Sequence, residues 1–147
     1  NKKEDYLGKL LKIDFSMMII ILAIVGIFTQ LSPLPQNKPL EWHQQANNIE
    51  FTTTISPKVP GNNHFMVDAS SQREGVNIKR IELYLEYKDN ADVAPIQVPF
   101  SEKEQSENVQ YMIDGKYLPF AGNWTAEIRI LDSEDNENVF RTDFIVY

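Results

Sequence analysis

The sequence predicts an all-β fold, an antiparallel β-sandwich of about seven strands, preceded by one transmembrane α-helix. Two observations support this prediction. Residues 17–28 carry no charged side chain and lie within an apolar stretch that is long enough to cross a bilayer. From residue 47 onward, apolar and polar residues alternate in short runs that are separated by turn-forming residues. Hydrophobic residues make up 42% of the chain, which is enough to build a packed core.

The apolar stretch from Ile13 to Leu31 predicts the helix. A bilayer core needs roughly 20 helical residues, and this stretch is about that long. Pro33 and Pro35 are expected to end the helix, because proline cannot continue it. A cleaved signal peptide is an alternative that the basic start would fit, although no typical cleavage site follows. A buried helix of a soluble core is a third possibility, but the stretch is apolar on all sides.

The lysines predict the orientation of the helix. Because lysine is enriched on the cytoplasmic side of membrane spans, the N-terminus is expected in the cytoplasm and the rest of the chain outside it. We therefore divide the chain into an amphipathic segment plus transmembrane helix (1–34), a linker (35–46) and an extracytoplasmic domain (47–147). The lysines before the predicted span are Lys2, Lys3, Lys9 and Lys12, and Lys38 follows it. An apolar stripe before the span, suited to the inner membrane surface, consists of Tyr6, Leu7, Leu10 and Leu11.

Seven alternating runs predict the strands of the sandwich. In each run every second residue is apolar, as expected for strands with one buried face. Seven short strands at this spacing indicate a sandwich that is immunoglobulin-like in outline. The runs are 49–55, 65–69, 81–87, 96–100, 109–113, 124–130 and one that ends at 144–147.

Composition argues against several functions. A net charge of −7 disfavours a nucleic-acid partner, and the lack of cysteine excludes disulfides and thiolate chemistry. The two histidines, His43 and His64, stand in no recognisable nucleophile motif, so we expect no enzymatic activity. The acidic run from Asp132 to Glu137 falls in a predicted hairpin turn and is expected to be its solvated tip. It also lacks the glycine and the terminal-Glu spacing of a calcium loop.

The segment "HFMVD" contains the candidate metal site. If Phe65 and Val67 point inward, then His64, Met66 and Asp68 share the outer face, with about 7 Å between successive members. Imidazole and thioether groups are ligands that suit copper, and methionine favours the reduced ion. The alternative is that these are three unrelated residues on a strand surface. His43 could supply a further ligand, but it falls in the predicted linker.

Longer stretches resemble a known family. The segment "KLLKIDFSMMIIILAIVGIFTQLSPLP" is similar to the final membrane helix of CopD-type copper-transport proteins, which has an acidic residue near its start and a threonine and proline exit. The part that follows resembles the YtkA-like module found behind such helices. The matching residues are Asp14, Thr29, Pro33 and Pro35 in the helix, and Pro60-Gly61-Asn62-Asn63, Phe65, Val67, Tyr111 and Ala121-Gly122-Asn123-Trp124 in the domain.

This resemblance implies a function in copper uptake or resistance. The chain would be the C-terminal part of a transporter in the bacterial plasma membrane, with the sandwich as an accessory to copper transport. Its partners would be the lipid bilayer, the other helices of the same transporter and a copper-carrying protein. A metal-free, membrane-anchored module for protein interactions is the alternative. Because the sequence begins with Asn rather than Met, we expect it to be part of a longer chain.

Overall fold

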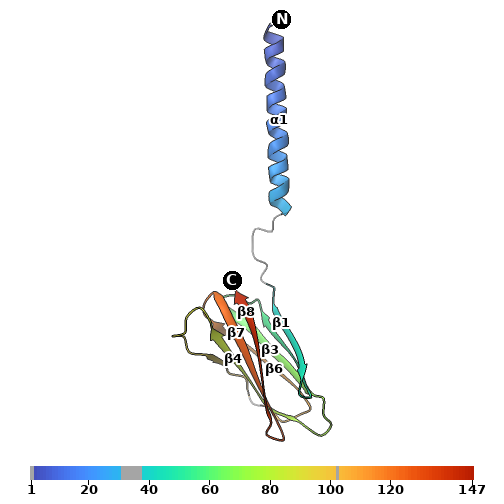
Figure 1. Ribbon diagram of the computed structural model, residues 1–147, viewed down its shortest axis with the longest axis vertical. Coiled ribbons are helices and arrows are strands. Elements are labelled where there is room, and N and C mark those ends of the chain that lie inside the picture. Colours follow the sequence, from blue (N-terminus) through green and yellow to red (C-terminus); the bar gives the residue numbers. More distant parts are fainter. Residues whose placement is uncertain (1, 31–37, 102) are drawn as a thin grey trace. The chain divides into compact units, whose positions relative to one another are not determined.

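The computed structural model describes residues 2–30, 38–101 and 103–147 (Figure 1). The chain divides into two compact units, one of residues 1–36 and one of residues 37–147. The first unit holds one helix, α1 (Lys2–Gln30), and the second holds the strands. The predicted order of a helix followed by a β-sandwich is therefore confirmed.

Helix α1 contains an apolar segment, Leu7–Ile27, whose length and composition suit a membrane span or a signal sequence. Its 21 residues would extend over about 32 Å. The described side chains of this segment are exposed, whereas the buried core of the second unit consists of strand residues, so the core-helix alternative is wrong. The predicted amphipathic segment and the predicted span lie in one continuous helix. Leu31, Pro33 and Pro35 lie outside the described residues.

Within the described residues, eight strands form two four-stranded antiparallel sheets (Figure 1). One sheet has the order β1-β2-β3-β6, and the other has the order β5-β4-β7-β8. All seven predicted runs lie wholly or partly in strands, and the chain changes sheets between β3 and β4, between β5 and β6, and between β6 and β7. The bounds are β1 Leu40–Ala46, β2 Ile49–Ser56, β3 Gly61–Ser71, β4 Ile78–Tyr87, β5 Ile96–Val98, β6 Asn108–Leu118, β7 Gly122–Asp132 and β8 Glu137–Val146.

Strand β1 was not predicted, because its residues fall in the expected linker 35–46. It pairs with β2 along its whole length, so the linker prediction is wrong from Leu40 onward. Trp42 takes an inward position, and its ring lies edge-on to Phe51 at 4.9 Å between centroids. Gln44 also takes an inward position, because it is half-buried and is the direct partner of the buried Phe51. A polar residue at an inward position interrupts the apolar alternation, which explains why the sequence pattern did not reveal this strand.

The core lies between the two sheets and consists of the inward residues of both. Trp124 is fully buried, and its indole N–H donates a hydrogen bond to the carbonyl oxygen of Phe120 at 3.1 Å. Burial of each large apolar side chain contributes about 1.5–3 kcal/mol. One buried hydroxyl, Thr53 Oγ1, has no hydrogen-bond partner within the described part of the chain. The largest fully buried side chains are Trp124, Phe51, Phe65, Ile55, Ile78, Leu83, Leu85, Leu118, Ile128, Ile130, Val67 and Val98.

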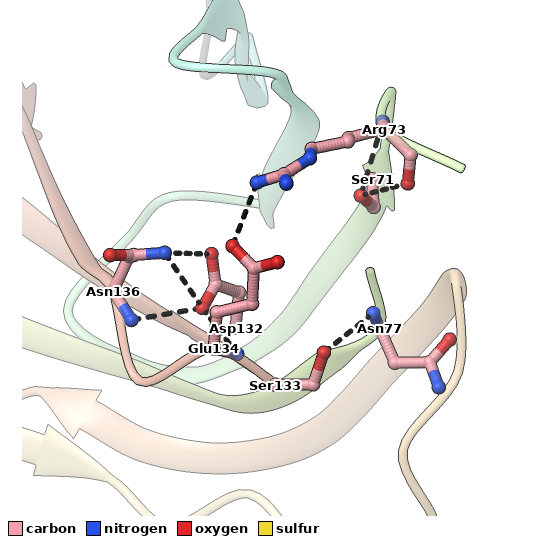
Figure 2. A network of polar contacts seen from close by, with 7 residues as sticks. All are labelled: Ser71, Arg73, Asn77, Asp132, Ser133, Glu134 and Asn136. Carbon is pink, nitrogen blue, oxygen red and sulfur yellow. Dashed lines mark hydrogen bonds and ion pairs between the residues drawn. The ribbon is translucent and has the colours of Figure 1, made fainter. Parts of the chain in front are cut away.

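The acidic turn between β7 and β8 is structural rather than fully solvated. Asp132 is only 9% exposed, so the prediction of a solvated turn is wrong for this residue. Figure 2 shows its carboxylate accepting hydrogen bonds from the backbone N–H groups of Glu134 and Asn136, both at 2.9 Å, and from the Asn136 side chain. Burial alone would raise the pKa of Asp132, but the bonds from Asn136 and Glu134 outweigh it and lower the pKa below its usual range.

The same turn joins the two sheets at one end of the sandwich (Figure 2). Arg73, in the loop between β3 and β4, contacts Glu134 at 2.7 Å. Asn77 and Ser133 exchange two hydrogen bonds, one between the Asn77 N–H and the Ser133 hydroxyl and one between the Ser133 N–H and the Asn77 carbonyl. This network fixes the β3–β4 crossover against the β7–β8 hairpin.

Candidate functional site

The outer face of the β1-β2-β3-β6 sheet carries all four predicted site residues. Phe65 and Val67 are fully buried, so His64, Met66 and Asp68 point to the opposite side of β3. His43 stands on β1 at an exposed position of the same outer face. The predicted orientation of the "HFMVD" strand is thus present in the structure. Which of these residues can act together depends on the pairing of the strands.

His64 has an acidic partner that the sequence pattern did not reveal. Its register partner across the β3–β6 pair is Asp114, and Nδ1 of the imidazole lies 2.8 Å from Oδ1 of the carboxylate. Both side chains are open to solvent, with 44% exposure for His64 and 70% for Asp114. An ionised carboxylate can only accept a hydrogen bond. The contact therefore favours the tautomer with its proton on Nδ1, which leaves the lone pair of Nε2 free.

Met66 also has an unpredicted partner, Met112. These two residues are directly opposite in the register of β3 and β6. Met112 is 55% exposed, a high value for a large apolar side chain in a sheet. The side-chain amide of Gln110, two residues before Met112, donates a hydrogen bond to Met66 Sδ at 3.8 Å. This contact draws the Met66 sulfur toward β6 on the side of Asp68, away from His64.

Asp68 and His43 lie in a different part of the face. Asp68 is the register partner of Gln110 on β6 and of Thr52 on β2, and it is about 13 Å along the strand from His64. His43 contacts the Thr52 hydroxyl through Nδ1 at 3.1 Å and Glu50 through Nε2 at 3.6 Å. The structure therefore does not place Asp68 or His43 where either could share one ion with His64.

No group of three His, Cys, Asp or Glu side chains suited to a metal ion occurs among residues 2–30, 38–101 and 103–147. A site of three side-chain ligands on this face would therefore need a donor of another kind, and methionine sulfur is one that lies beside His64. His64, Met66 and Met112 offer one imidazole nitrogen and two thioethers at neighbouring positions of two paired strands. The two thioethers are soft ligands and imidazole binds copper as well, so the chemistry that this set suits best is the binding of a soft monovalent metal ion.

The residues of the sandwich that carry the family resemblance build turns or belong to the buried core. Asn63 is fully buried, and its side chain accepts hydrogen bonds from the N–H groups of Lys58 and Val59 and donates to the carbonyls of Val59 and Gly61. It thereby closes the β2–β3 turn immediately before His64. Gly122 adopts φ 129° at the start of β7. These motifs support the fold around the candidate site rather than supplying its ligands.

Comparison with known proteins finds a similarity to a copper transport protein. No protein-family model matches the chain. The chain is 25% identical, over 141 residues, to the copper transport protein CutJ of Bacillus subtilis. The match covers 92% of the chain, which leaves about 12 of 147 residues outside it, so it takes in much of α1 together with the sandwich. The chain spans 26% of the length of CutJ. Both units of this chain are therefore related in sequence to part of a copper transport protein.

Proposed function

We propose that this chain is the C-terminal, membrane-anchored part of a bacterial copper transporter, and that its sandwich is an accessory domain outside the cytoplasm. The single observation that carries this proposal is the match to CutJ, because it extends through the helix and the sandwich together. A shared isolated sandwich would indicate only a common fold. A match that covers both the helix and the sandwich of this chain indicates a common organisation.

The character of α1 supports the anchoring part of the proposal. Its apolar segment, Leu7–Ile27, has the length of a bilayer core, and its described side chains are available to lipid or to neighbouring helices. Four lysines lie in the first 12 residues, which favours a cytoplasmic N-terminus. In the proposed arrangement α1 packs against other helices of the transporter in the plasma membrane.

The outer face of the sandwich supports a non-catalytic role. His64 is held by Asp114 so that one ring nitrogen remains available, and two methionines lie next to it. Such a face can bind an ion without changing it chemically. The proposed task of the domain is to receive copper from a carrier protein and to present it to the membrane part of the transporter.

Cellular copper content tests this function. In the bacterium that encodes the chain, residues 38–147 are deleted from the gene, and total copper, zinc and manganese are measured at low and at elevated external copper. The proposal expects a change in copper with unchanged zinc and manganese, because the domain would serve one metal. Restoration of normal copper by the full-length gene is the control. Unchanged copper in the deletion strain would contradict the proposal and would favour the metal-free interaction module.

A further inference from the structure

We infer that Met66, Met112 and His64 form a binding site for one Cu(I) ion on the outer face of strands β3 and β6. This inference deepens the proposed function and rests on it for the identity of the metal. The sandwich contains two of the four methionines of the chain, and these two are direct cross-strand partners. The other two, Met17 and Met18, lie in α1.

The strand register brings the three ligands together. Directly opposite residues of an antiparallel pair have Cβ atoms about 4.5–5.5 Å apart, so the flexible side chains of Met66 and Met112 can meet above the β3–β6 seam. His64 is the next residue of β3 on the same face, about 7 Å from Met66 along the strand. Relative to Met112 it occupies the diagonal position, which long side chains can bridge. The three groups can therefore converge on one point above the sheet.

The donor atoms match a reduced copper ion. Thioether sulfur is a soft ligand that selects Cu(I), and imidazole nitrogen binds copper as well. Cu(II) prefers a tetragonal arrangement of nitrogen and oxygen ligands. One imidazole with two thioethers does not provide that arrangement. The set thus favours Cu(I), and also the similarly soft ion Ag(I).

Asp114 prepares His64 for this role. Metal-binding histidines usually donate their second ring N–H to a carboxylate or a carbonyl, which fixes the tautomer and the ring orientation. The contact of His64 Nδ1 with Asp114 Oδ1 at 2.8 Å has this form and directs Nε2 away from the carboxylate. The hydrogen bond from Gln110 to Met66 Sδ is long, at 3.8 Å. Gln110 pairs with Asp68, on the side of Met66 away from His64, so in the proposed site the Met66 side chain gives up this weak contact and turns toward His64.

Competition for Cu(I) tests the site directly. The full chain is reconstituted in lipid nanodiscs without oxygen and titrated with Cu(I) against bicinchoninate, a coloured Cu(I) chelator. We expect one tight equivalent for the unaltered chain. Met66→Leu and Met112→Leu conserve volume, so each should leave the fold intact. Each should weaken binding by more than the roughly tenfold loss that is typical when an outer partner of a metal ligand is removed.

The chain contains its own matched control. The double variant Met17→Leu/Met18→Leu removes the same two sulfur atoms from α1 and should bind Cu(I) as tightly as the unaltered chain. Both tryptophans of the chain, Trp42 and Trp124, are in the sandwich, so their fluorescence reports whether each variant is folded. X-ray absorption at the copper edge should show sulfur neighbours that disappear in the double variant Met66→Leu/Met112→Leu.

Three results would overturn the inference. The first is no Cu(I) binding by the unaltered chain. The second is a folded double variant Met66→Leu/Met112→Leu that binds Cu(I) as tightly as the unaltered chain. The third is an α1 control that loses as much Cu(I) affinity as the Met66→Leu/Met112→Leu variant. The test is separable from that of the proposed function. The double variant can lose Cu(I) binding in nanodiscs and still restore normal cellular copper. In that case copper transport does not use this site, and the proposed function remains valid. If Cu(I) binds as expected but deletion leaves cellular copper unchanged, the proposed function fails.

Discussion

Nδ1 of His64 lies 2.8 Å from Oδ1 of Asp114, although the two residues are 50 positions apart in the chain. The contact depends on the pairing of β3 with β6, which makes these residues direct register partners. It orients an exposed imidazole on a sheet face where a free side chain would sample several rotamers. Its effect on metal affinity can be measured independently of the ligands themselves.

Removal of the carboxylate should weaken Cu(I) binding without abolishing it. In Asp114→Ala the imidazole loses the acceptor that fixes its tautomer, and we expect about 10- to 100-fold weaker binding. Asp114→Asn keeps an acceptor oxygen and should lose less. The same nanodisc competition provides the measurement, with Asp92→Ala, an exposed carboxylate in the β4–β5 loop, as the control. Equal affinity in Asp114→Ala and the unaltered chain would show that the contact does not position His64.

The orientation of the chain can be tested by labelling a single cysteine. The chain contains no cysteine, so an introduced one is its only thiol. Ala94 is an exposed loop residue, and Ala94→Cys should react with a membrane-impermeant maleimide in intact cells. Lys3→Cys, before the apolar segment, should react only after lysis. The opposite pattern would reverse the proposed topology.

The unpartnered hydroxyl of Thr53 predicts a stabilising substitution. Thr53 is fully buried, and Oγ1 has no hydrogen-bond partner among the described residues. Thr53→Val replaces this hydroxyl with a methyl group of similar size and removes a desolvation cost of about 1–3 kcal/mol. We expect a higher urea midpoint by tryptophan fluorescence. A loss of stability would indicate that the hydroxyl is satisfied in solution, for example by a water molecule.

Acid should destabilise the sandwich partly through Asp132. The pKa of this carboxyl is lowered in the folded chain, so its contribution is fully present above the pKa of the unfolded chain and is lost as the pH falls through the folded pKa. Asp132→Asn should lower the free energy of unfolding at pH 7 by about 1–3 kcal/mol, because one acceptor of the turn is lost. The difference between the two chains should shrink as the pH is lowered below about 4. A difference that does not depend on pH would contradict this explanation.

Gly122 should not tolerate a side chain. It has φ 129°, and a Cβ atom at this position would overlap the Asp89 carboxylate. That carboxylate accepts hydrogen bonds from the backbone and side-chain nitrogens of Asn123, both at 2.8 Å. We expect Gly122→Ala to lower the free energy of unfolding by more than the about 1–3 kcal/mol that backbone strain alone costs.

Gly61→Ala is the matched control for Gly122→Ala. Gly61 also has a positive φ, 107°, but nothing lies within 4 Å of the Cβ that would be added. This variant should therefore lose stability through strain alone. Equal losses in the two variants, measured as urea midpoints, would show that the Asp89 contact adds nothing.

The strands and the outward direction of His64 and Met66 could be predicted from the sequence, because period-two alternation reports directly on which side chains face a core. The partners of these residues could not. Alternation around Tyr111 places Met112 and Asp114 on an outer face, but it does not say which strand lies beside β6. That neighbour is β3, because the intervening β4 and β5 belong to the other sheet. Pairing between distant strands is a property of the topology and not of local pattern.

Two further differences between prediction and structure have local causes. Strand β1 is short of apolar residues because Gln44 occupies an inward position at the edge of the sheet. Asp132 is buried because the turn that follows supplies three N–H groups to its carboxylate. The sequence shows that the residue is charged, but it does not show that such donors surround it. In both cases a polar residue occupies a position that pattern analysis assigns to apolar residues or to solvent.

The exposure of Met112, at 55%, bears on how fast an ion could leave the sandwich. A ligand on an open sheet surface can be approached by an incoming donor before the outgoing one has departed. Exchange between two proteins could then proceed through a shared, mixed-ligand intermediate, and no strand would have to separate. Release from such a surface would be limited by the substitution of one ligand for another. The packed core between the two sheets would stay unchanged during transfer.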